Sequence, residues 1–510
     1  MEERPMAKAK IKIYLSEPIG IITPTIYGHF AEHLGGVIYD GIWVGEQSDV
    51  PNVRGIRSAL VEAMRKINPP VVRWPGGCFA DHYDWRDGIG PKEKRPKRTN
   101  FWMLRDPKHP EETNAFGTHE FIDFCHQIGA EPYIVANVGS GSPKEFARWV
   151  EYCNCSADTS LTRERRANGS PKPFGVRYWG IGNENWGCGG HFTPEDYCAQ
   201  YTRFATYAYD FGVGVRLIAC GPSGNDLEWT RRFFEKLTQG RAGKFRAPIW
   251  GFAPHYYCGS AGTALEFTDS QWYQLLSQAA YMGTLIQEQW EAMAEYDPQH
   301  QVKLVVDEWG CWHPSGSEIN PCHLYEQMST LRDALAAALT LDIFNNHCNK
   351  VAMANLAQLV NNLHSLFLAD GHRFVCTPNY YVFDMYKEHQ GAKCLRTEFE
   401  ADDISYTIDG EKRIVPGLWG SASVRESRLT LTLVNPGLGE PLETEIVLVK
   451  GEVKKAVQTV LTHRDIHAHN TFRAPDVLMP KSKELGVTGE KFTAELQRAS
   501  VSKFTLALGT

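Results

Sequence analysis

The sequence predicts an α/β fold, a (β/α)8 TIM barrel followed by a C-terminal β-sandwich, and three observations support this prediction. Apolar strand-like runs alternate with amphipathic helical stretches between residues 21 and 390. Polar residues gather at the carboxyl ends of the strand-like runs, where barrels of this kind carry their chemistry. After about residue 390, short alternating strands separated by Gly, Pro and Asn turns replace the helical stretches.

Composition limits the classes of protein to consider. A chain of 510 residues exceeds one compact core, so two domains are expected. The formal net charge of −7 gives no support to a polyanion-binding surface, so nucleic acid is not an expected partner. No apolar run reaches the roughly 18 residues of a membrane helix, and residues 1–8 lack the apolar core of a signal peptide. We therefore expect a cytoplasmic protein that makes no membrane contact.

The cysteines point to the same compartment. Thirteen cysteines, an odd number, are scattered along a chain too large to depend on disulfides. This pattern predicts reduced thiols in a cytoplasm rather than a disulfide framework. Cys78, Cys188 and Cys311 lie near the expected mouth of the barrel, but no paired general base marks any of them as a nucleophile.

Eight strand–helix units follow one another in the barrel region, which is the number and order of a (β/α)8 barrel. The first helix ends just before Asn68-Pro69-Pro70, because proline stops a helix. The predicted strands are 26–33, 71–76, 132–138, 177–184, 216–220, 249–257, 302–308 and 351–360. The predicted helices are 56–67, 118–128, 143–152, 194–211, 227–237, 270–296, 323–346 and 380–389. The polar stretch 154–172 has no period and is predicted to be a surface loop.

The two ends of the chain are predicted to share the sandwich. Residues 8–15 alternate polar and apolar side chains, as a half-exposed antiparallel strand does. The C-terminal region contains four further alternating runs, at 427–434, 443–449, 456–461 and 500–508. The expected domains are therefore an N-terminal strand (1–20) that joins the sandwich, a catalytic barrel (21–390) and a jelly-roll-like sandwich (391–510).

Two carboxylates at strand ends form the candidate catalytic pair. RYWGIGNENW (177–186) places Glu184 at the end of the fourth strand, and VKLVVDEWG (302–310) places Glu308 at the end of the seventh. A carboxyl pair is the minimum apparatus for hydrolysing a glycosidic bond, one as acid and one as nucleophile or base. For either glutamate alone, a structural salt bridge is the better interpretation, and it is the two together, at strands four and seven, that favour catalysis.

Neighbouring residues refine this prediction. Asn183 offers an amide that could bind a sugar hydroxyl, and Trp179 offers a flat face for a ring. Asp307 is a rival to Glu308, but neighbours on a strand point to opposite faces, so only one of the two is expected to face the catalytic centre. Asp307 is then left to hold the next loop.

Six motifs extend the argument from two residues to the whole barrel. They are YGHFAEHLGG (27–36), RWPGGCFADHYDWRDGIGP (73–91), YWGIGNENWGCGG (178–190), HYY (255–257), DEWG (307–310) and MANLAQLVN (353–361). In content and order they resemble family 51 of the glycoside hydrolases, whose best-known members are α-L-arabinofuranosidases. The motifs cover the barrel from end to end, and the flanking β regions resemble the sandwich of that family.

The resemblance implies roles for particular residues. Glu184 is implied as the acid/base and Glu308 as the nucleophile. Four residues match positions that line the subsite for the terminal furanose, namely Glu32, Asn183, Tyr257 and Gln358. Cys78 is implied as a further substrate-binding residue, although it stands where some relatives have asparagine, and DEWG-Cys311-Trp312 departs from the more familiar DEWN-x-W pattern. The family needs no cofactor and its members are commonly hexamers, so a homo-oligomer, hexameric or trimeric, is expected.

Supporting roles stay more open. Arg73 fits two interpretations equally well: it could order a carboxylate beneath the site, or form a plain ion pair in the barrel core. His255 precedes two tyrosines at a strand end and is placed with Arg73 and Trp179 among the supporting residues. The histidines of the barrel do not show metal-ligand spacing, so no metal site is predicted.

The sequence therefore predicts a retaining exo-glycosidase that removes terminal α-L-arabinofuranosyl groups from oligosaccharides, without naming the linkage. One alternative keeps the two-glutamate mechanism and changes the substrate to a galactofuranoside, a xyloside or an endo-glucan. A second alternative is a carbohydrate-binding barrel without catalysis, against which the presence of both glutamates argues.

Overall fold

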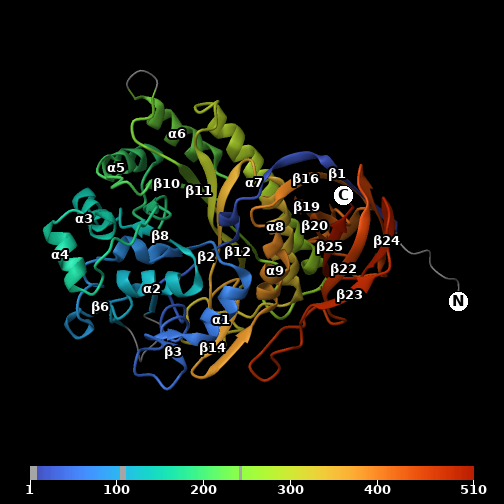
Figure 1. Ribbon diagram of the computed structural model, residues 1–510, viewed down its shortest axis with the longest axis horizontal. Helices are drawn as coiled ribbons and strands as arrows, with labels where there is room; N and C mark the ends of the chain where they lie inside the picture. Colours follow the sequence, from blue (N-terminus) through green and yellow to red (C-terminus); the bar gives the residue numbers. More distant parts are fainter. Residues whose placement is uncertain (1–7, 104–110, 241–243, 510) are drawn as a thin grey trace.

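The computed structural model describes residues 8–103, 111–240 and 244–509. Eight parallel strands close into a barrel in the order β10-β11-β12-β13-β2-β5-β8-β9, which confirms the predicted (β/α)8 fold (Figure 1). The strands are β2 (Gly28–Phe30), β5 (Val71–Trp74), β8 (Glu131–Ala136), β9 (Tyr178–Ile181), β10 (Arg216–Ser223), β11 (Gly251–Gly259), β12 (Lys303–Trp312) and β13 (Val351–Leu356).

Helices surround the barrel and cover the outward faces of its strands (Figure 1). Several begin at a side chain that accepts a backbone N–H in the first turn, as Ser142, Thr193 and Asp226 do. The helices that follow the strands are α1 (Ser58–Ile67), α2 (Thr118–Ile128), α3 (Pro143–Asn154), α5 (Pro194–Thr206), α6 (Leu227–Thr238), α7 (Asp269–Ala294), α8 (Leu331–Asn346) and α9 (Pro378–Tyr386).

Two helix predictions were wrong. The stretch 154–172, predicted as a loop, contains helix α4 (Ser160–Ala167), which Thr159 begins by accepting the Thr162 N–H. Helix α8 begins at Leu331 instead of residue 323, because the Asp333 carboxylate accepts the Thr330 N–H and closes a capping box there. In both places a cap decides the boundary, which the apolar pattern alone does not show.

The barrel interior is filled by alternate residues of the strands. Tyr133 and Tyr178 pack there with apolar side chains of the neighbouring strands, including Val71, Ile218 and Val305. The residues that alternate with these along each strand point outwards and pack against the helices. The carboxyl ends of the strands, above this packed interior, are where polar groups converge.

The second part of the chain is a β-structure with nine strands in one hydrogen-bonded sheet. Its order is β23-β22-β25-β20-β19-β16-β1-β21-β24. As predicted, the N-terminal strand is included: β1 pairs antiparallel with β16 and parallel with β21. The bounds are β1 (Lys8–Ile21), β16 (Lys393–Glu400), β19 (Trp419–Arg425), β20 (Arg428–Asn435), β21 (Leu442–Val449), β22 (Val453–Thr462), β23 (Lys481–Leu485), β24 (Lys491–Leu496) and β25 (Ser500–Leu508).

This sheet folds over on itself to enclose a core of its own. Phe492 on β24 and Phe504 on β25 are far apart in strand order, yet their ring centroids lie 6.2 Å apart. The Gln458 side chain on β22 likewise donates to the Glu495 carbonyl on β24. This is the predicted sandwich. The domain limits at residues 20 and 390 stay a prediction, and residues 1–7 of the first segment lie outside the described residues.

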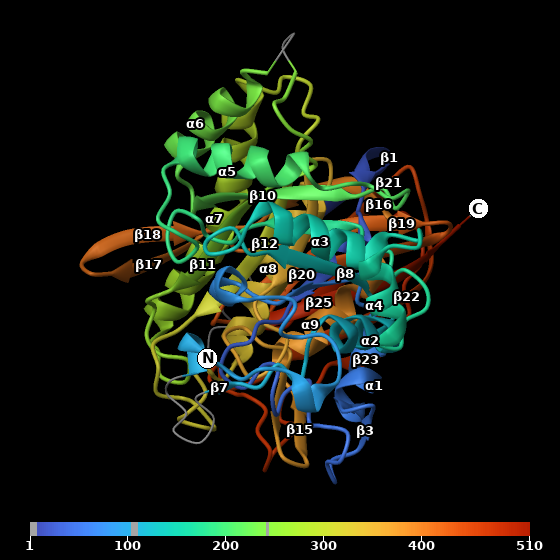
Figure 2. The same ribbon diagram turned by 90° about the vertical axis from the view of Figure 1, so that its left-hand side faces the viewer.

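A two-stranded hairpin extends from the sandwich region. Strands β17 (Ile404–Ile408) and β18 (Glu411–Val415) pair antiparallel and lie beside α7, with the rings of Tyr273 and Tyr406 5.8 Å apart, while the end of the hairpin extends outwards (Figure 2). In the parts of the chain that the structure describes, no helix is both long and apolar enough to cross a bilayer.

A buried polar network joins the barrel to the sandwich. Asp342 on α8 accepts hydrogen bonds from the hydroxyls of Ser421 (2.6 Å), Thr432 (2.6 Å) and Tyr386 (2.8 Å). Burial raises the pKa of Asp342 from 3.8 to about 7, since these neutral hydroxyls only partly replace the lost water. The carboxyl therefore keeps its proton in the folded protein at pH values where the unfolded chain releases it.

This network predicts a pH-dependent stability that Asp342→Asn removes. Stability contributed by a carboxyl with a raised folded-state pKa is present below the unfolded pKa and falls as the pH rises towards about 7. The melting temperature of Asp342→Asn, relative to wild type, should therefore increase from pH 5 to pH 8. Thermal unfolding at the two pH values measures this, and a difference independent of pH would contradict it.

Candidate active site

Glu184 follows the end of β9, and Glu308 lies in the carboxyl-terminal half of β12, three strands further round the barrel. Glu184 follows β9 in a turn where Gly187 N–H donates to the Glu184 carbonyl (2.7 Å). Gly182 begins this turn with a φ of +80°, and a Cβ there would lie 2.1 Å from the Asn185 side-chain oxygen. Glycine is therefore required for the chain to turn out of the strand and present Glu184.

His255, in the middle of β11, joins the two carboxylates. Its Nδ1 lies 3.0 Å from Glu184 Oε1 and 3.4 Å from Glu308 Oε2, while its Nε2 lies 2.8 Å from Asp307 Oδ1. Burial lowers the pKa of His255, but attraction to Glu308 and the hydrogen bonds to Asp307 and Glu184 outweigh burial and raise the pKa to about 10. His255 is therefore an imidazolium that donates from both nitrogens.

Arg73, on β5, has both of the roles that the sequence left open. Its Nη1 donates to Glu308 Oε1 (2.7 Å), and its Nη2 donates to Asn183 Oδ1 (2.6 Å). It also forms a buried ion pair with Asp307, at 3.2 Å. Arg73 occupies the oxygen of the Asn183 amide, and Nδ2 of the same amide lies 3.9 Å from Cys188 Sγ, a weak acceptor that leaves the second N–H hydrogen for another partner.

Asp307 corrects a prediction. We expected it to point away from Glu308, but both carboxylates contact Arg73 and His255. The pairing of β12 with β13 moves from Val306↔Ala354 to Trp309↔Leu356, so β12 has one extra residue at this point. Such a bulge breaks the strand alternation and turns consecutive side chains to the same side.

Burial and the neighbouring positive charges shift the pKa of Glu308 in opposite directions. Burial raises the pKa of Glu308 above its usual range, and the charges of His255 and Arg73 oppose this effect only in part. Tyr257 adds a hydrogen bond from its hydroxyl to Glu308 Oε2, at 2.8 Å. Both oxygens of Glu308 thus have donors that favour its ionised form, which is the form a nucleophile requires.

Glu32 and Gln358 lie together beside this group. Gln358 Nε2 donates to Glu32 Oε2 (2.9 Å), and the Phe79 N–H donates to Glu32 Oε1 (3.0 Å). Burial and repulsion from Glu308 raise the pKa of Glu32 to about 8. Glu32 is therefore protonated at neutral pH, so that no second negative charge is added next to Glu308.

Trp179 does not reach the site, contrary to the prediction that it offers a face to the sugar. Its side chain is fully buried on the outward side of β9, against Phe146 and Trp149. Its indole N–H donates to the Val176 carbonyl. Strand alternation explains the difference, since Tyr178 and Gly180 take the inward positions.

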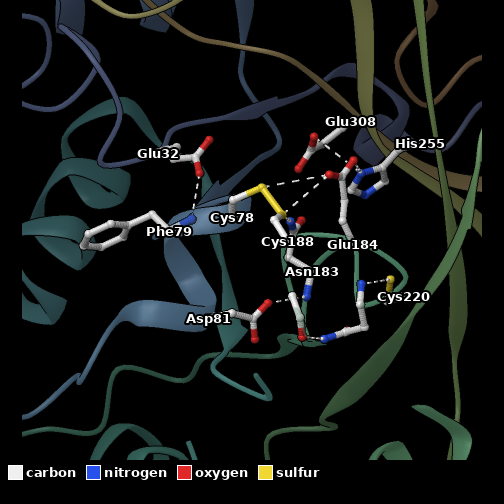
Figure 3. The surroundings of a disulfide bond; sticks show 12 residues. Glu32, Cys78, Phe79, Asp81, Asn183, Glu184, Cys188, Cys220, His255 and Glu308 are labelled. Carbon is white, nitrogen blue, oxygen red and sulfur yellow. Dashed lines mark hydrogen bonds and ion pairs between the residues drawn. A yellow bond between two sulfur atoms is a disulfide. The ribbon is translucent and has the colours of Figure 1, made fainter. Parts of the chain in front are cut away.

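Cys78 and Cys188 form a disulfide, which corrects the prediction that all cysteines are free thiols. Figure 3 shows both sulfurs beside the Glu184 carboxylate: Cys188 Sγ lies 3.7 Å and Cys78 Sγ 4.0 Å from Glu184 Oε2. Disulfide sulfurs have no hydrogen to donate, so these are van der Waals contacts. The other eleven cysteines are free.

Asp81 is a site residue that the sequence reasoning missed, although it lies within the PGGCFADHYDW motif. Its buried carboxylate accepts backbone N–H groups from Val138 (2.8 Å) and Gly139 (2.7 Å). It also accepts the Asn183 N–H (3.3 Å; Figure 3), and so connects the loops after β5, β8 and β9. Burial raises the pKa of Asp81 to about 7 despite these hydrogen bonds. The signal in the sequence was weak: an aspartate in the loop after one strand, and glycine-containing loops after the next two strands, whose backbone N–H groups it binds.

Glu184, His255 and Glu308 also have ligand types that bind metals, and one potential ligand atom from each lies within 4.8 Å of the others. A metal needs a lone pair on the imidazole. Both ring nitrogens of His255 are already engaged, Nδ1 with Glu184 Oε1 at 3.0 Å and Nε2 with Asp307 Oδ1 at 2.8 Å. The cluster is therefore better suited to positioning carboxyl groups than to holding a metal.

Comparison with protein families gives two matches. Residues 63–241 match the α-L-arabinofuranosidase 1 domain, and residues 307–500 match the α-L-arabinofuranosidase C-terminal domain. Among curated proteins, the chain is 38% identical over 509 residues to an intracellular exo-α-L-arabinofuranosidase of Bacteroides ovatus, covering 98% of this chain and 95% of the relative.

Solved structures agree along the whole chain. The GH51 arabinofuranosidase of Xanthomonas axonopodis pv. citri superimposes with a TM-score of 0.91 at 36% identity, covering 98% of this chain and 100% of the other. The α-L-arabinofuranosidase of Thermotoga maritima, solved as an arabinose complex, gives a TM-score of 0.86 at 31% identity with the same coverage.

Proposed function

Because this chain belongs to family 51 of the glycoside hydrolases, we propose that it is an exo-acting α-L-arabinofuranosidase. Its substrates are oligosaccharides with terminal, non-reducing α-L-arabinofuranosyl groups. The observation that carries the proposal is the group formed by Glu184, His255 and Glu308, in which two carboxyl groups face one another at the barrel mouth. An exo-acting enzyme releases one arabinose at a time, which an analysis of products over time would reveal.

The carboxyl separation supports a retaining mechanism. One oxygen of Glu184 and one of Glu308 lie within 4.8 Å of one another. Retaining glycosidases hold their carboxyl groups about 5–5.5 Å apart, whereas inverting enzymes leave about 6.5–9.5 Å for a water. A directly attacking carboxylate therefore fits here, and a carboxylate-bound water does not.

The reaction has two displacements. Ionised Glu308 attacks the anomeric carbon while Glu184 gives its proton to the departing glycosidic oxygen, which leaves a covalent arabinosyl-enzyme. Glu184, now a carboxylate, then takes a proton from water, and that water displaces Glu308 from the sugar. Arg73 and Tyr257 hold the two Glu308 oxygens in place for the attack.

The remaining polar groups account for recognition of the sugar. The Asn183 amide, held by Arg73 at its oxygen and beside Cys188 Sγ at its nitrogen, keeps one N–H hydrogen for the sugar, and Glu32 and Gln358 form a second polar edge. The Gln358 side-chain carbonyl oxygen is buried and has no hydrogen-bond partner among the residues that the structure describes. A buried carbonyl that accepts nothing is suited to a sugar hydroxyl.

Substrate ranking tests the choice of sugar. We expect kcat/KM for nitrophenyl α-L-arabinofuranoside to exceed those for the β-D-galactofuranoside and the β-D-xylopyranoside, because buried polar groups left unpaired by the wrong sugar cost binding in the transition state. If the arabinofuranoside does not rank first under identical conditions, the substrate proposal fails while the two-glutamate mechanism stands.

Asn183→Ala tests the recognition mechanism separately. The Asn183 amide is expected to contact the 2-hydroxyl of the sugar. A contact to that hydroxyl strengthens in the oxocarbenium-like transition state. Asn183→Ala should therefore lower kcat by about 10²-fold, and not only raise KM. Steady-state kinetics separate the two parameters, and a change confined to KM would mean that Asn183 binds ground state and transition state equally.

Location and assembly complete the proposal. A cytoplasmic location is supported by the relative from Bacteroides ovatus that is named intracellular. A homo-oligomer, hexameric or trimeric, is proposed as well, and Ile414, 60% exposed on the projecting β17–β18 hairpin, is an apolar group that self-association would cover. Light scattering after size-exclusion chromatography tests the assembly.

A further inference from the structure

The Cys78–Cys188 disulfide connects two loops that carry parts of the site. Cys78 begins a short 3-10 helix after β5, and Cys188 lies in the turn that follows Glu184. The two cysteines are 110 residues apart in the sequence, and strand β8 lies between β5 and β9 in the barrel. The bond therefore ties the acid/base turn to a loop that is two strands away.

Glu184 needs such a restraint because its own backbone is unfavourable. Its φ is +41°, in the left-handed region that side chains with a Cβ disfavour. Backbone of this kind persists only where the surroundings hold it. Gly187 and Gly189 donate to the Glu184 carbonyl from within the same turn, so neither fixes the turn to the rest of the barrel.

The attachments of this turn to the barrel lie on different sides. Asn185 N–H contacts Cys220 Sγ at 3.3 Å, and Asn183 N–H contacts the Asp81 carboxylate at 3.3 Å, both beneath the turn. The disulfide is the covalent attachment, and its sulfurs touch the Glu184 carboxylate itself (Figure 3). Glu184 Oε1 is held by His255 on the other side.

The carboxyl group of Glu184 is thus enclosed between a donor and a donor-free surface. His255 binds Oε1, and the two sulfurs pack against Oε2. In reduced form the two sulfurs would separate and each would gain a hydrogen, so that the wall beside Oε2 would change in shape and become a pair of weak donors. Oε2 is the oxygen that His255 leaves free to deliver a proton.

We propose that the Cys78–Cys188 disulfide is a positioning element for the acid/base Glu184, so that its reduction selectively impairs protonation of the leaving group. This inference rests on the proposed glycosidase function. Cys78 and Cys188 are both partly exposed, and therefore open to a dithiol. A dithiol thiolate attacks one sulfur and its second thiol completes the exchange, so that two electrons and two protons pass to Cys78 and Cys188 while the reductant becomes a cyclic disulfide.

The test compares two arabinofuranosides that differ in their need for acid catalysis. Methyl α-L-arabinofuranoside has a poor leaving group that must be protonated, whereas the 2,4-dinitrophenyl glycoside does not require protonation. With dithiothreitol, kcat/KM for the methyl glycoside should fall by about 10- to 100-fold, and that for the dinitrophenyl glycoside by less than about 3-fold. Reoxidation should restore the methyl glycoside activity.

Variants supply the matched controls. Cys78→Ala/Cys188→Ala places no new donor beside Glu184, should show the same selective loss, and should no longer respond to dithiothreitol. Cys376→Ala removes a free, half-buried cysteine on β15 (Arg373–Cys376) and should behave as wild type. Should the double variant not fold, the reductant titration of wild type, followed by thiol counting, still decides the question.

Each outcome is informative. An equal loss on both glycosides would show a general structural role and overturn the positioning proposal, as would unchanged kinetics after both thiols have been counted as free. Two free thiols at Cys78 and Cys188 in protein purified under air would also overturn it. If the oxidised enzyme cleaves neither arabinofuranoside, the proposed function itself has failed, which is a different result from any of these.

Discussion

Glu308→Ala is expected to reduce kcat for every glycoside by roughly 10⁴-fold or more, because no covalent intermediate can form without the attacking carboxylate. The loss should be the same for good and poor leaving groups, because neither kind of group can depart without attack of the carboxylate on the anomeric carbon. Steady-state assays on nitrophenyl and methyl arabinofuranosides measure it.

Folding must be checked alongside this result, because Glu308 offsets the buried positive charges of Arg73 and His255. Glu308→Gln retains the shape and an acceptor oxygen for Arg73, and should be equally inactive but better folded. Glu62→Ala, at an exposed position on α1, is the matched control and should keep full activity. Substantial turnover by a folded Glu308→Gln would remove Glu308 from the role of nucleophile.

Glu184→Ala is expected to lower kcat/KM by roughly 10²- to 10⁴-fold for methyl or oligosaccharide leaving groups. Dinitrophenyl arabinofuranoside should still form the intermediate, since its leaving group needs little protonation. The intermediate should then accumulate, because water lacks a general base for the second step. Rapid-quench kinetics would show a burst of dinitrophenol followed by slow turnover.

Azide provides a stereochemical check on this variant. It needs no general base, and can occupy the space left by the Glu184 side chain beside the sulfurs of Cys78 and Cys188. Two successive inversions, by Glu308 and then by azide, should yield the α-arabinofuranosyl azide. A β-azide product from Glu184→Ala would instead indicate a single displacement and refute the retaining mechanism.

Sequence patterns predicted the barrel, which the structure confirms, and placed the two candidate glutamates at its mouth, because both predictions depend on local information. Alternating strands and helices in eight units specify a closed barrel, and the carboxyl end of each strand follows from the end of an apolar run. Glu184 and Glu308 could therefore be placed at one mouth from their positions alone. The starts of helices α4 and α8 could not be predicted from the apolar pattern, because capping interactions at Thr159 and Thr330 determine them.

Other features depend on register and on contacts between distant residues. A single extra residue in β12 turns Asp307 towards Arg73, and strand alternation turns Trp179 away from the site. The sequence alone determined which strands carry acids, because hydrophobic periodicity is local. Only the tertiary structure decided which side chains face one another, and that Cys78 meets Cys188 across 110 residues, because closing the barrel brings together loops that no local pattern relates.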